Sequence, residues 1–374
     1  MNESMEGMMG AAHARRLARL RAAMTAAGIP ALYTTHPYNR RYLTGYTGED
    51  HLPNESAGAV LVLPDVAYLH VARLNATQAR AEAPEYTVVD YFKRSDAPDQ
   101  VKELAAKHGI THLGFEEDSI LFATHKMLAD ALPGATLAPV GTLVTQLRDT
   151  KDAAEIASLR RAQAITVAAF TVVAPRIAAG MTEKQVAWEL EKAVHDAGGA
   201  GMAFSTIVGA GENGARPHHG VSDRPIREGE PIVIDMGALY DGYCGDLTRT
   251  IVVGEPDAQF RRVYDTVLRA MRHVEEVARP GMKGGELDAA ARDVITEAGY
   301  GDAFIHTTGH GVGLQVHEGP SARTDGEDVF GPGMTLTVEP GIYLEGWGGV
   351  RIEDLVVFTE NGIENLTDAP ILSV

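Results

Sequence analysis

The sequence has few of the features that mark secreted, membrane-embedded or nucleic-acid-binding proteins. Its one cysteine, Cys244, allows no disulfide bond within the chain, which favours a reducing compartment, so we expect a cytoplasmic protein. It contains no run of about 18 or more apolar residues, so no membrane partner is expected. The first residues, MNESMEGMMGAA, lack the basic start and apolar stretch of a secretory signal.

Positive charge is also scarce. The 374 residues include 33 Lys and Arg against 51 Asp and Glu, which gives a formal net charge of −18. This excess of acid disfavours nucleic acid and anionic membrane surfaces as general partners. One stretch, residues 13–24 (HARRLARLRAAM), is basic, and we interpret it as an amphipathic surface helix whose Leu and Met side chains face inward.

The length of the chain predicts two domains, and the pattern of apolar residues changes near Asp149. Over residues 1–148, helical and strand patterns alternate, which predicts an α/β domain with a mixed sheet. The helices are expected at residues 11–27 and 99–109, and the strands at 31–35, 56–63, 66–71 and 111–116.

Residues 149–374 read differently, as helices collected against an antiparallel sheet in an α+β domain. Asp152 is the expected N-cap of the first long helix, with Glu155 at capping-box spacing. The other helices are expected at residues 183–198, 257–278 and 285–298, and strands at 232–250, 335–344 and 349–358.

Residues 232–250, IVIDMGALYDGYCGDLTRT, predict a β-hairpin that turns at Asp241-Gly242. Counting back from a two-residue turn places Gly237 opposite Asp246. Asp235 then lies on the same face as Asp246, and their backbones are diagonal neighbours about 7–8 Å apart. Two carboxylates on a half-buried face repel, so they require a compensating cation or proton, unless the pair lies at a solvated rim.

Further metal-type donors follow downstream. Glu339 ends the polar face of TLTVEP, Glu353 lies on the polar face of GVRIEDLVVF, and His310 lies between two glycines. Together with the two aspartates, this set of four carboxylates and one histidine balances the charge of two divalent ions. An oxygen-rich set favours hard or borderline ions such as manganese or cobalt over a thiolate-type zinc site.

The ordered set Asp235, Asp246, His310, Glu339 and Glu353 resembles the ligand set of the pita-bread metallopeptidases. That family includes methionine aminopeptidase, aminopeptidase P and prolidase, with creatinase as a relative that lacks the metal site. The smaller N-terminal domain resembles the proline-specific branch. The resemblance implies a curved antiparallel sheet in residues 149–374, two divalent ions (manganese first, cobalt or zinc as alternatives) and a homodimer.

The resemblance also implies roles for the ligands. Asp246 and Glu353 would bridge both ions, Asp235 would complete the shell of one, and His310 with Glu339 the shell of the other. Glu339 would in addition carry a proton from the bridging water to the leaving nitrogen.

Four more residues match positions of the family that meet the substrate. In RPHHG the choice lies between His219, which we favour, and His218. His317 would stabilise the tetrahedral intermediate. Arg351 would orient the site or meet the substrate, the alternative being a plain salt bridge with its acidic neighbours.

The activity implied is hydrolysis of Xaa-Pro bonds by a metal-bridging hydroxide, in a peptide with proline at its second position. An Xaa-Pro dipeptidase is favoured over an Xaa-Pro aminopeptidase, which acts on longer peptides. Against the dipeptidase, Ser321 occupies the position of an arginine found in several prolidases, and Arg323, two residues on, is the substitute. A non-enzymatic binding protein is disfavoured because the ligand set is intact. Tyr46 and His51 could line the pocket, although loop packing is the stronger expectation.

Overall fold

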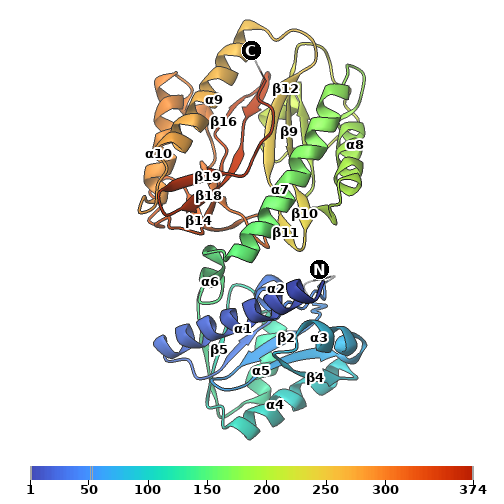
Figure 1. The fold of residues 1–374 in the computed structure, drawn as a ribbon, viewed down its shortest axis with the longest axis vertical. Helices are drawn as coiled ribbons and strands as arrows, with labels where there is room; N and C mark the ends of the chain where they lie inside the picture. The colour runs from blue at the N-terminus through green and yellow to red at the C-terminus, as the bar shows by residue number, and fades with distance from the viewer. Residues whose placement is uncertain (1, 51, 53, 373–374) are drawn as a thin grey trace. The chain divides into compact units, whose positions relative to one another are not determined.

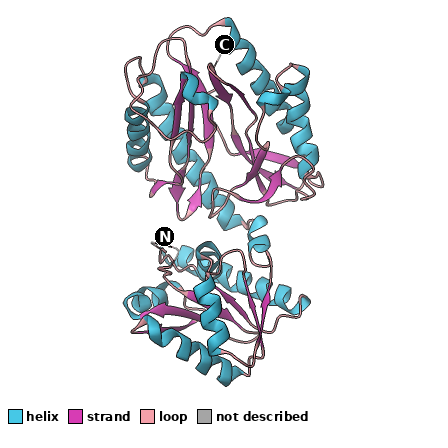
Figure 2. Cartoon of the chain, turned by 180° about the vertical axis from the view of Figure 1, so that it is seen from behind, coloured by secondary structure: helices cyan, strands magenta, loops and turns pink. Residues whose placement is uncertain are grey.

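The computed structural model describes residues 2–50, 52 and 54–372. The chain divides into two compact units, Met1–Arg148 and Asp149–Val374, and each is described by itself (Figures 1 and 2).

A mixed sheet forms the centre of the N-terminal unit, as predicted, with strand order β4-β3-β2-β1-β5-β6. Strand β2 runs antiparallel to β1 and β3, and the other neighbours are parallel. The strands are β1 Leu32–Thr34, β2 Ala59–Val62, β3 Ala67–Ala72, β4 Thr87–Tyr91, β5 His112–Phe115 and β6 Thr136–Pro139. The helices are α1 Asn2–Ala26, α2 Pro37–Thr44, α3 Ala76–Glu82, α4 Ala97–His108, α5 Phe122–Ala131 and α6 Thr145–Asp149, which crosses the boundary, with short 3₁₀ turns at Arg73–Asn75 and Arg94–Asp96.

Two local predictions for this unit are confirmed. Helix α4 ends at Gly109, whose positive φ of 61° is accessible to glycine without strain. Helix α1 buries Leu17, Leu20 and Met24, so the apolar stripe of the basic stretch faces inward. The helix begins at Asn2, earlier than the predicted residue 11.

The C-terminal unit is built from small antiparallel sheets, as predicted, with strand orders β12-β9-β8, β11-β10-β7, β15-β18-β19, β13-β14 and β16-β17. Its helices are α7 Ala153–Val173, α8 Glu183–Asp196, α9 Ala258–Val277 and α10 Gly284–Glu297, with 3₁₀ turns at Ala174–Arg176, Gly211–Ala215 and Gly301–Ala303. Its strands are β7 Gly201–Met202, β8 Ile207–Ala210, β9 Pro231–Met236, β10 Ala238–Tyr240, β11 Tyr243–Cys244, β12 Leu247–Val252, β13 Gly309–Gly311, β14 Glu318–Ala322, β15 Thr335–Val338, β16 Gly341–Leu344, β17 Gly348–Arg351, β18 Asp354–Thr359 and β19 Gly362–Asn365.

This unit has two halves, each a pair of helices against strands (Figure 1). Helices α7 and α8 share a buried apolar cluster with β8 and β9, and α9 and α10 share another with β15 and β18. The long helical stretch Ala153–Arg176 has the length and composition of a membrane span, the one such stretch among the described residues. Its inner face packs in the first cluster, which accounts for its apolar character.

The cap and the turn predicted for this unit are both present. Asp152 accepts hydrogen bonds from the backbone N–H groups of Ala154 and Glu155, and the Glu155 side chain accepts one from the Asp152 N–H. At the hairpin tip Tyr240 pairs with Tyr243, and both turn residues have positive φ, as a type I′ turn requires.

Candidate active site

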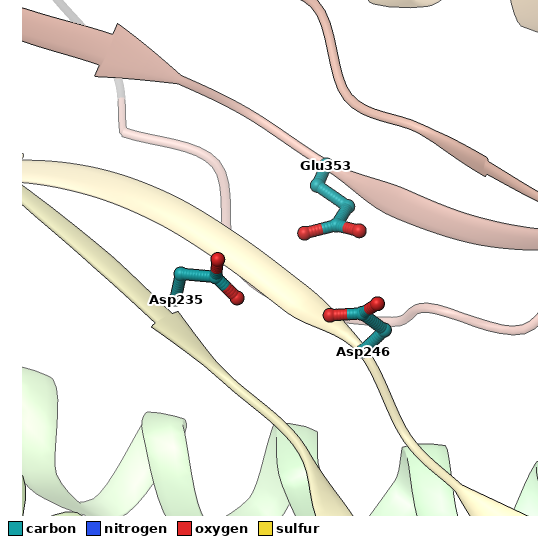
Figure 3. Close-up of side chains that lie close together, drawn as sticks. All are labelled: Asp235, Asp246 and Glu353. Atoms are coloured by element: carbon teal, nitrogen blue, oxygen red, sulfur yellow. The ribbon is translucent and has the colours of Figure 1, made fainter. Parts of the chain in front are cut away.

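The hairpin carries its two aspartates to one point, in the register that the sequence predicts. Asp235 pairs with Thr248 across β9 and β12, and this register continues that of the tip. The backbone N–H of Glu353 donates to the Thr248 carbonyl at 3.1 Å, which brings a third carboxylate beside the pair. One ligand oxygen from each of Asp235, Asp246 and Glu353 lies within 4.8 Å of the others, and the three side chains face a common space (Figure 3).

Helix α7 holds the backbone of Asp246 in place through Gln163. The Gln163 side-chain oxygen accepts the Asp246 N–H, and its side-chain N–H₂ donates to the Asp246 carbonyl, both at 2.8 Å. The helix comes this close because residue 245 is glycine. A Cβ there would lie 2.3 Å from the Thr166 hydroxyl oxygen and 2.9 Å from the Ala162 carbonyl oxygen.

His310 and Glu339 meet on the strands that follow. Gly309 permits the approach, since a Cβ on it would lie 1.7 Å from the Thr337 carbonyl oxygen. The Thr337 hydroxyl accepts the His310 N–H at 3.0 Å and donates to the Glu339 carboxylate at 2.9 Å. His310 Nδ1 lies 3.1 Å from the Gly311 carbonyl, which assigns the proton to Nδ1 and leaves Nε2 as the donor atom for a metal. That Nε2 lies 3.1 Å from Glu339 Oε1 and 4.0 Å from Asp246 Oδ2.

Arg351 is buried and binds the same cluster. Its guanidinium donates to Asp235 Oδ2 at 2.5 Å, to the Tyr343 hydroxyl at 2.8 Å and to the Thr248 hydroxyl at 3.0 Å. The Thr248 hydroxyl in turn donates to Glu353 at 2.7 Å. Arg351 therefore forms the salt bridge that was the alternative to a direct role. This bridge holds Oδ2 of Asp235, one of the candidate metal ligands.

The electrostatics of the cluster call for cations. Burial and the neighbouring carboxylates raise the pKa of Asp246 and of Glu353 well above the ordinary value. Burial would also raise the pKa of Glu339, but its hydrogen bond with His310 and the charge of that ring lower it to about 2.

The residues fit divalent ions. Asp235 Oδ1 is buried and makes no hydrogen bond with any residue that the structure describes, while Oδ2 is held by Arg351. A buried carboxylate oxygen without a donor is costly, and a metal ion is the partner that this donor set suits. Asp235, Asp246, His310, Glu339 and Glu353 are the residues that would hold the ions.

These groups border a cavity of about 820 Å³ in the C-terminal unit. His317 is exposed in it, and its ring lies edge-on to that of His310 at 4.3 Å between centroids. Burial, followed by the charge of His310, lowers the pKa of His317. Part of the wall is apolar, formed by Phe204, Ile207, Pro217, Val221 and Val316.

The two adjacent histidines, of which the sequence favoured His219, differ in their surroundings. His219 borders the cavity, but its Nε2 lies 2.8 Å from Glu183, a fully buried carboxylate, so one nitrogen of its ring is already bound. His218 borders the same cavity, is exposed, and makes no hydrogen bond with any described residue. The ring of His218 is therefore the more accessible of the two. The sequence RPHHG holds no signal that separates the two, because the decision depends on a carboxylate 36 residues away.

The structure does not bring Arg323 into the cavity. The side chain of Arg323 is exposed and is not among those that line the cavity. Ser321, on β14, pairs with His310 on β13 and does not line the cavity either. Of the two N-terminal residues considered for the pocket, Tyr46 is buried near Arg40 in its own unit, and His51 lies outside the described residues.

Sequence reasoning missed His306 and Tyr343. His306 borders the cavity, and its Nε2 lies 2.8 Å from the Tyr343 hydroxyl. That hydroxyl also accepts a hydrogen bond from Arg351. Burial lowers the pKa of His306. The sequence held one signal of their place in the site: His306 lies four residues before His310, and Tyr343 lies four residues after Glu339.

A buried donor set of this kind beside an open cavity defines a metal-dependent hydrolase. The chain belongs to metallopeptidase family M24, whose model matches residues 157–360, and a creatinase/prolidase N-terminal domain model matches residues 16–150. It is therefore a peptidase that depends on divalent metal ions.

Individual relatives extend over nearly the whole chain. A Xaa-Pro dipeptidase of Pyrococcus furiosus is 36% identical over 94% of this chain and 97% of its own length. The structure of a Xaa-Pro dipeptidase from Bacillus anthracis superposes with a TM-score of 0.91, at 37% identity over 97% of this chain and 99% of that one. An X-Pro aminopeptidase from Thermotoga maritima gives 0.87, at 34% identity over 96% and 99%. The N-terminal α/β domain and the C-terminal pita-bread fold are both shared with such proteins.

Proposed function

We propose that this chain is a Xaa-Pro dipeptidase that cleaves dipeptides with proline at the second position. The observation that carries the proposal is the convergence of Asp235, Asp246, His310, Glu339 and Glu353 on one side of a cavity with free histidines. The relatives named Xaa-Pro dipeptidase, aligned over almost the full length, support the choice of substrate.

When bound, divalent ions would supply Lewis acidity, which lowers the pKa of water and polarises a carbonyl. The side chains of the protein do the rest. Glu339 accepts a proton from the attacking water and hands it to the leaving proline nitrogen. His317, exposed next to His310, donates to the developing negative oxygen. Arg351 holds Asp235 in one orientation.

The proline ring would lie against the apolar wall. An Xaa-Pro amide has no N–H to recognise, so selection depends on shape and on the ends of the substrate. Among the described residues that line the cavity, Arg351 is the one Arg or Lys, and it is bound to Asp235. The free carboxylate of a dipeptide would therefore meet His218, in place of Arg323.

Three finer assignments belong to the same proposal. Manganese is the metal we propose, since oxygen ligands outnumber nitrogen in the site. A homodimer follows the family resemblance, and a cytoplasmic location follows the single cysteine. Metal analysis of the purified protein and light scattering after size-exclusion chromatography test the first two.

The test compares Ala-Pro with Ala-Pro-Ala, using metal-stripped protein reloaded with manganese, and Ala-Ala as the control for proline. Cleavage of Ala-Pro alone is the expected result. Comparable or better cleavage of Ala-Pro-Ala would make the protein an Xaa-Pro aminopeptidase. With His218→Ala we expect a higher KM for Ala-Pro, while His219→Ala should instead lower the stability of the fold.

A further inference from the structure

The N-terminal unit contains a second cavity, of about 380 Å³, which takes no part in the peptidase site. It lies at the carboxyl edge of the parallel strands. Thr35 follows the end of β1, Tyr91 ends β4, and Leu121, Thr124 and Met127 lie just before and within α5, which follows β5. Open α/β sheets bind their ligands at this edge, where the order of the strands reverses. Here the chain runs outward from β1 to β4 and then returns to β5 on the other side of β1.

The strand register places the lining residues on one face of the sheet. Ala59 pairs with His70 and Ala72 with Tyr91, while Tyr33 pairs with Leu61, two residues along β2 from Ala59. Since side chains alternate between faces, Tyr33, His70 and Tyr91 point to the same side. Helices α4 and α5 cover that side, packing into one apolar cluster with Tyr33 (Figure 1).

Tyr33 supplies an unused polar group. Its side chain borders the cavity, only 4% of the residue is exposed, and its hydroxyl makes no hydrogen bond with any described residue. The hydroxyl is not among the enclosed polar atoms without a partner, so it is accessible from the cavity, where a ligand that accepts a hydrogen bond can reach it. Burial also raises the pKa of Tyr33, which keeps the hydroxyl protonated and able to donate.

His70 supplies the complementary group. Gln100 donates through its side-chain N–H₂ to the Asp90 carbonyl at 2.9 Å, so its oxygen is the atom that faces His70 Nε2 at 2.5 Å. The ring proton is therefore on Nε2, and Nδ1 is left as an acceptor without a hydrogen bond to any described residue. His70 is 3% exposed, and burial lowers its pKa, which favours the neutral ring.

None of the described residues that line this cavity is an Asp, Glu, Lys or Arg. We propose that the cavity binds a small uncharged lactam, a cyclic amide whose N–H donates to His70 Nδ1 and whose carbonyl accepts from the Tyr33 hydroxyl. A lactam carries one donor and one acceptor, and Tyr33 on β1 and His70 on β3 offer the matching pair from the same face of the sheet. The volume lies at the small end of the range for ligand pockets.

The test is saturation-transfer difference NMR on the full chain with 2-pyridone as the probe. Tyr33→Phe should bind 2-pyridone about tenfold more weakly, the loss of one hydrogen bond to a buried partner. Tyr86→Phe is the matched control, because its hydroxyl donates to the Leu43 carbonyl and it does not border the cavity. N-Methyl-2-pyridone, which lacks the N–H, should not bind.

Two further readouts separate binding from folding and from the peptidase site. Tyr33→Phe loses no hydrogen bond to a described residue, so it should melt at or above the wild-type temperature and keep the wild-type kcat/KM for Ala-Pro. Failure of 2-pyridone to saturate the wild-type protein would overturn the proposal. Equal binding to Tyr33→Phe, or a lower melting temperature for that variant, would overturn it as well.

Discussion

Replacing Gln163 by Leu should weaken metal binding without touching any metal ligand. The Gln163 amide bonds the backbone N–H and carbonyl of Asp246 and also donates to the Thr367 hydroxyl at 2.8 Å. Residue 163 is fully buried, and leucine fills a similar volume. The change therefore removes the hydrogen bonds that hold the backbone of Asp246 and leaves the core packed.

The magnitude follows from these contacts. Three hydrogen bonds are lost, each worth about 1 kcal/mol, and the two Asp246 backbone groups stay buried without partners, which costs more. We expect the free energy of unfolding to fall by about 3–4 kcal/mol. Groups that orient a metal ligand from behind it typically change metal affinity by 10- to 100-fold, so a loss of that size is expected here.

The assay is a manganese titration of the stripped protein, followed by calorimetry and by recovery of activity. Thr166→Val is the control, one turn along α7. It leaves the Ala238 N–H without its acceptor, so it should destabilise the fold by about 1–2 kcal/mol but keep wild-type manganese affinity. Equal manganese affinity in Gln163→Leu and the wild type would refute the argument that α7 positions Asp246.

Three further predictions follow from the charges. Burial and then Asp354 raise the pKa of Glu275 from 4.5 to about 7, so this carboxyl costs no stability below pH 4.5, costs more as pH rises from 4.5 to 7, and has its full destabilising effect above pH 7. Glu275→Gln should thus be more stable than the wild type by about 1 kcal/mol at pH 8, after allowing for partial exposure, and equal at pH 4 in urea unfolding, whereas exposed Glu276→Gln should change neither value. Glu183 accepts hydrogen bonds from Ala210, Asn213, His219 and Ser222. Glu183→Gln would place an N–H₂ donor against these donors, so it should lower the free energy of unfolding by about 2–3 kcal/mol. An unchanged free energy of unfolding would contradict this network. Chelation should lower the melting temperature and manganese should restore it, since an ion that binds only the folded state stabilises it; a melting temperature indifferent to chelator would count against the metal site.

The sequence by itself determined the local pattern and the list of candidate metal donors. A two-residue turn and a strand period of two are enough to place Asp235 and Asp246 on one face, and the hairpin has the predicted register. The cap at Asp152 and the end of α4 at Gly109 likewise depend only on neighbours within a few residues. Such features are predictable because the interactions that decide them are short in sequence.

Tertiary structure alone decided which side chains are free to act. His218 and His219 are adjacent and both border the cavity, and Glu183, brought from helix α8, binds the ring of His219 and leaves that of His218 unbound by any described residue. Gln163 meets Asp246 across 83 residues, and Arg351 meets Asp235 across 116. Arg323, close to the site in sequence, stays outside it. Hydrogen bonding and burial depend on packing between distant segments, and that packing has no signature in the local order of residues.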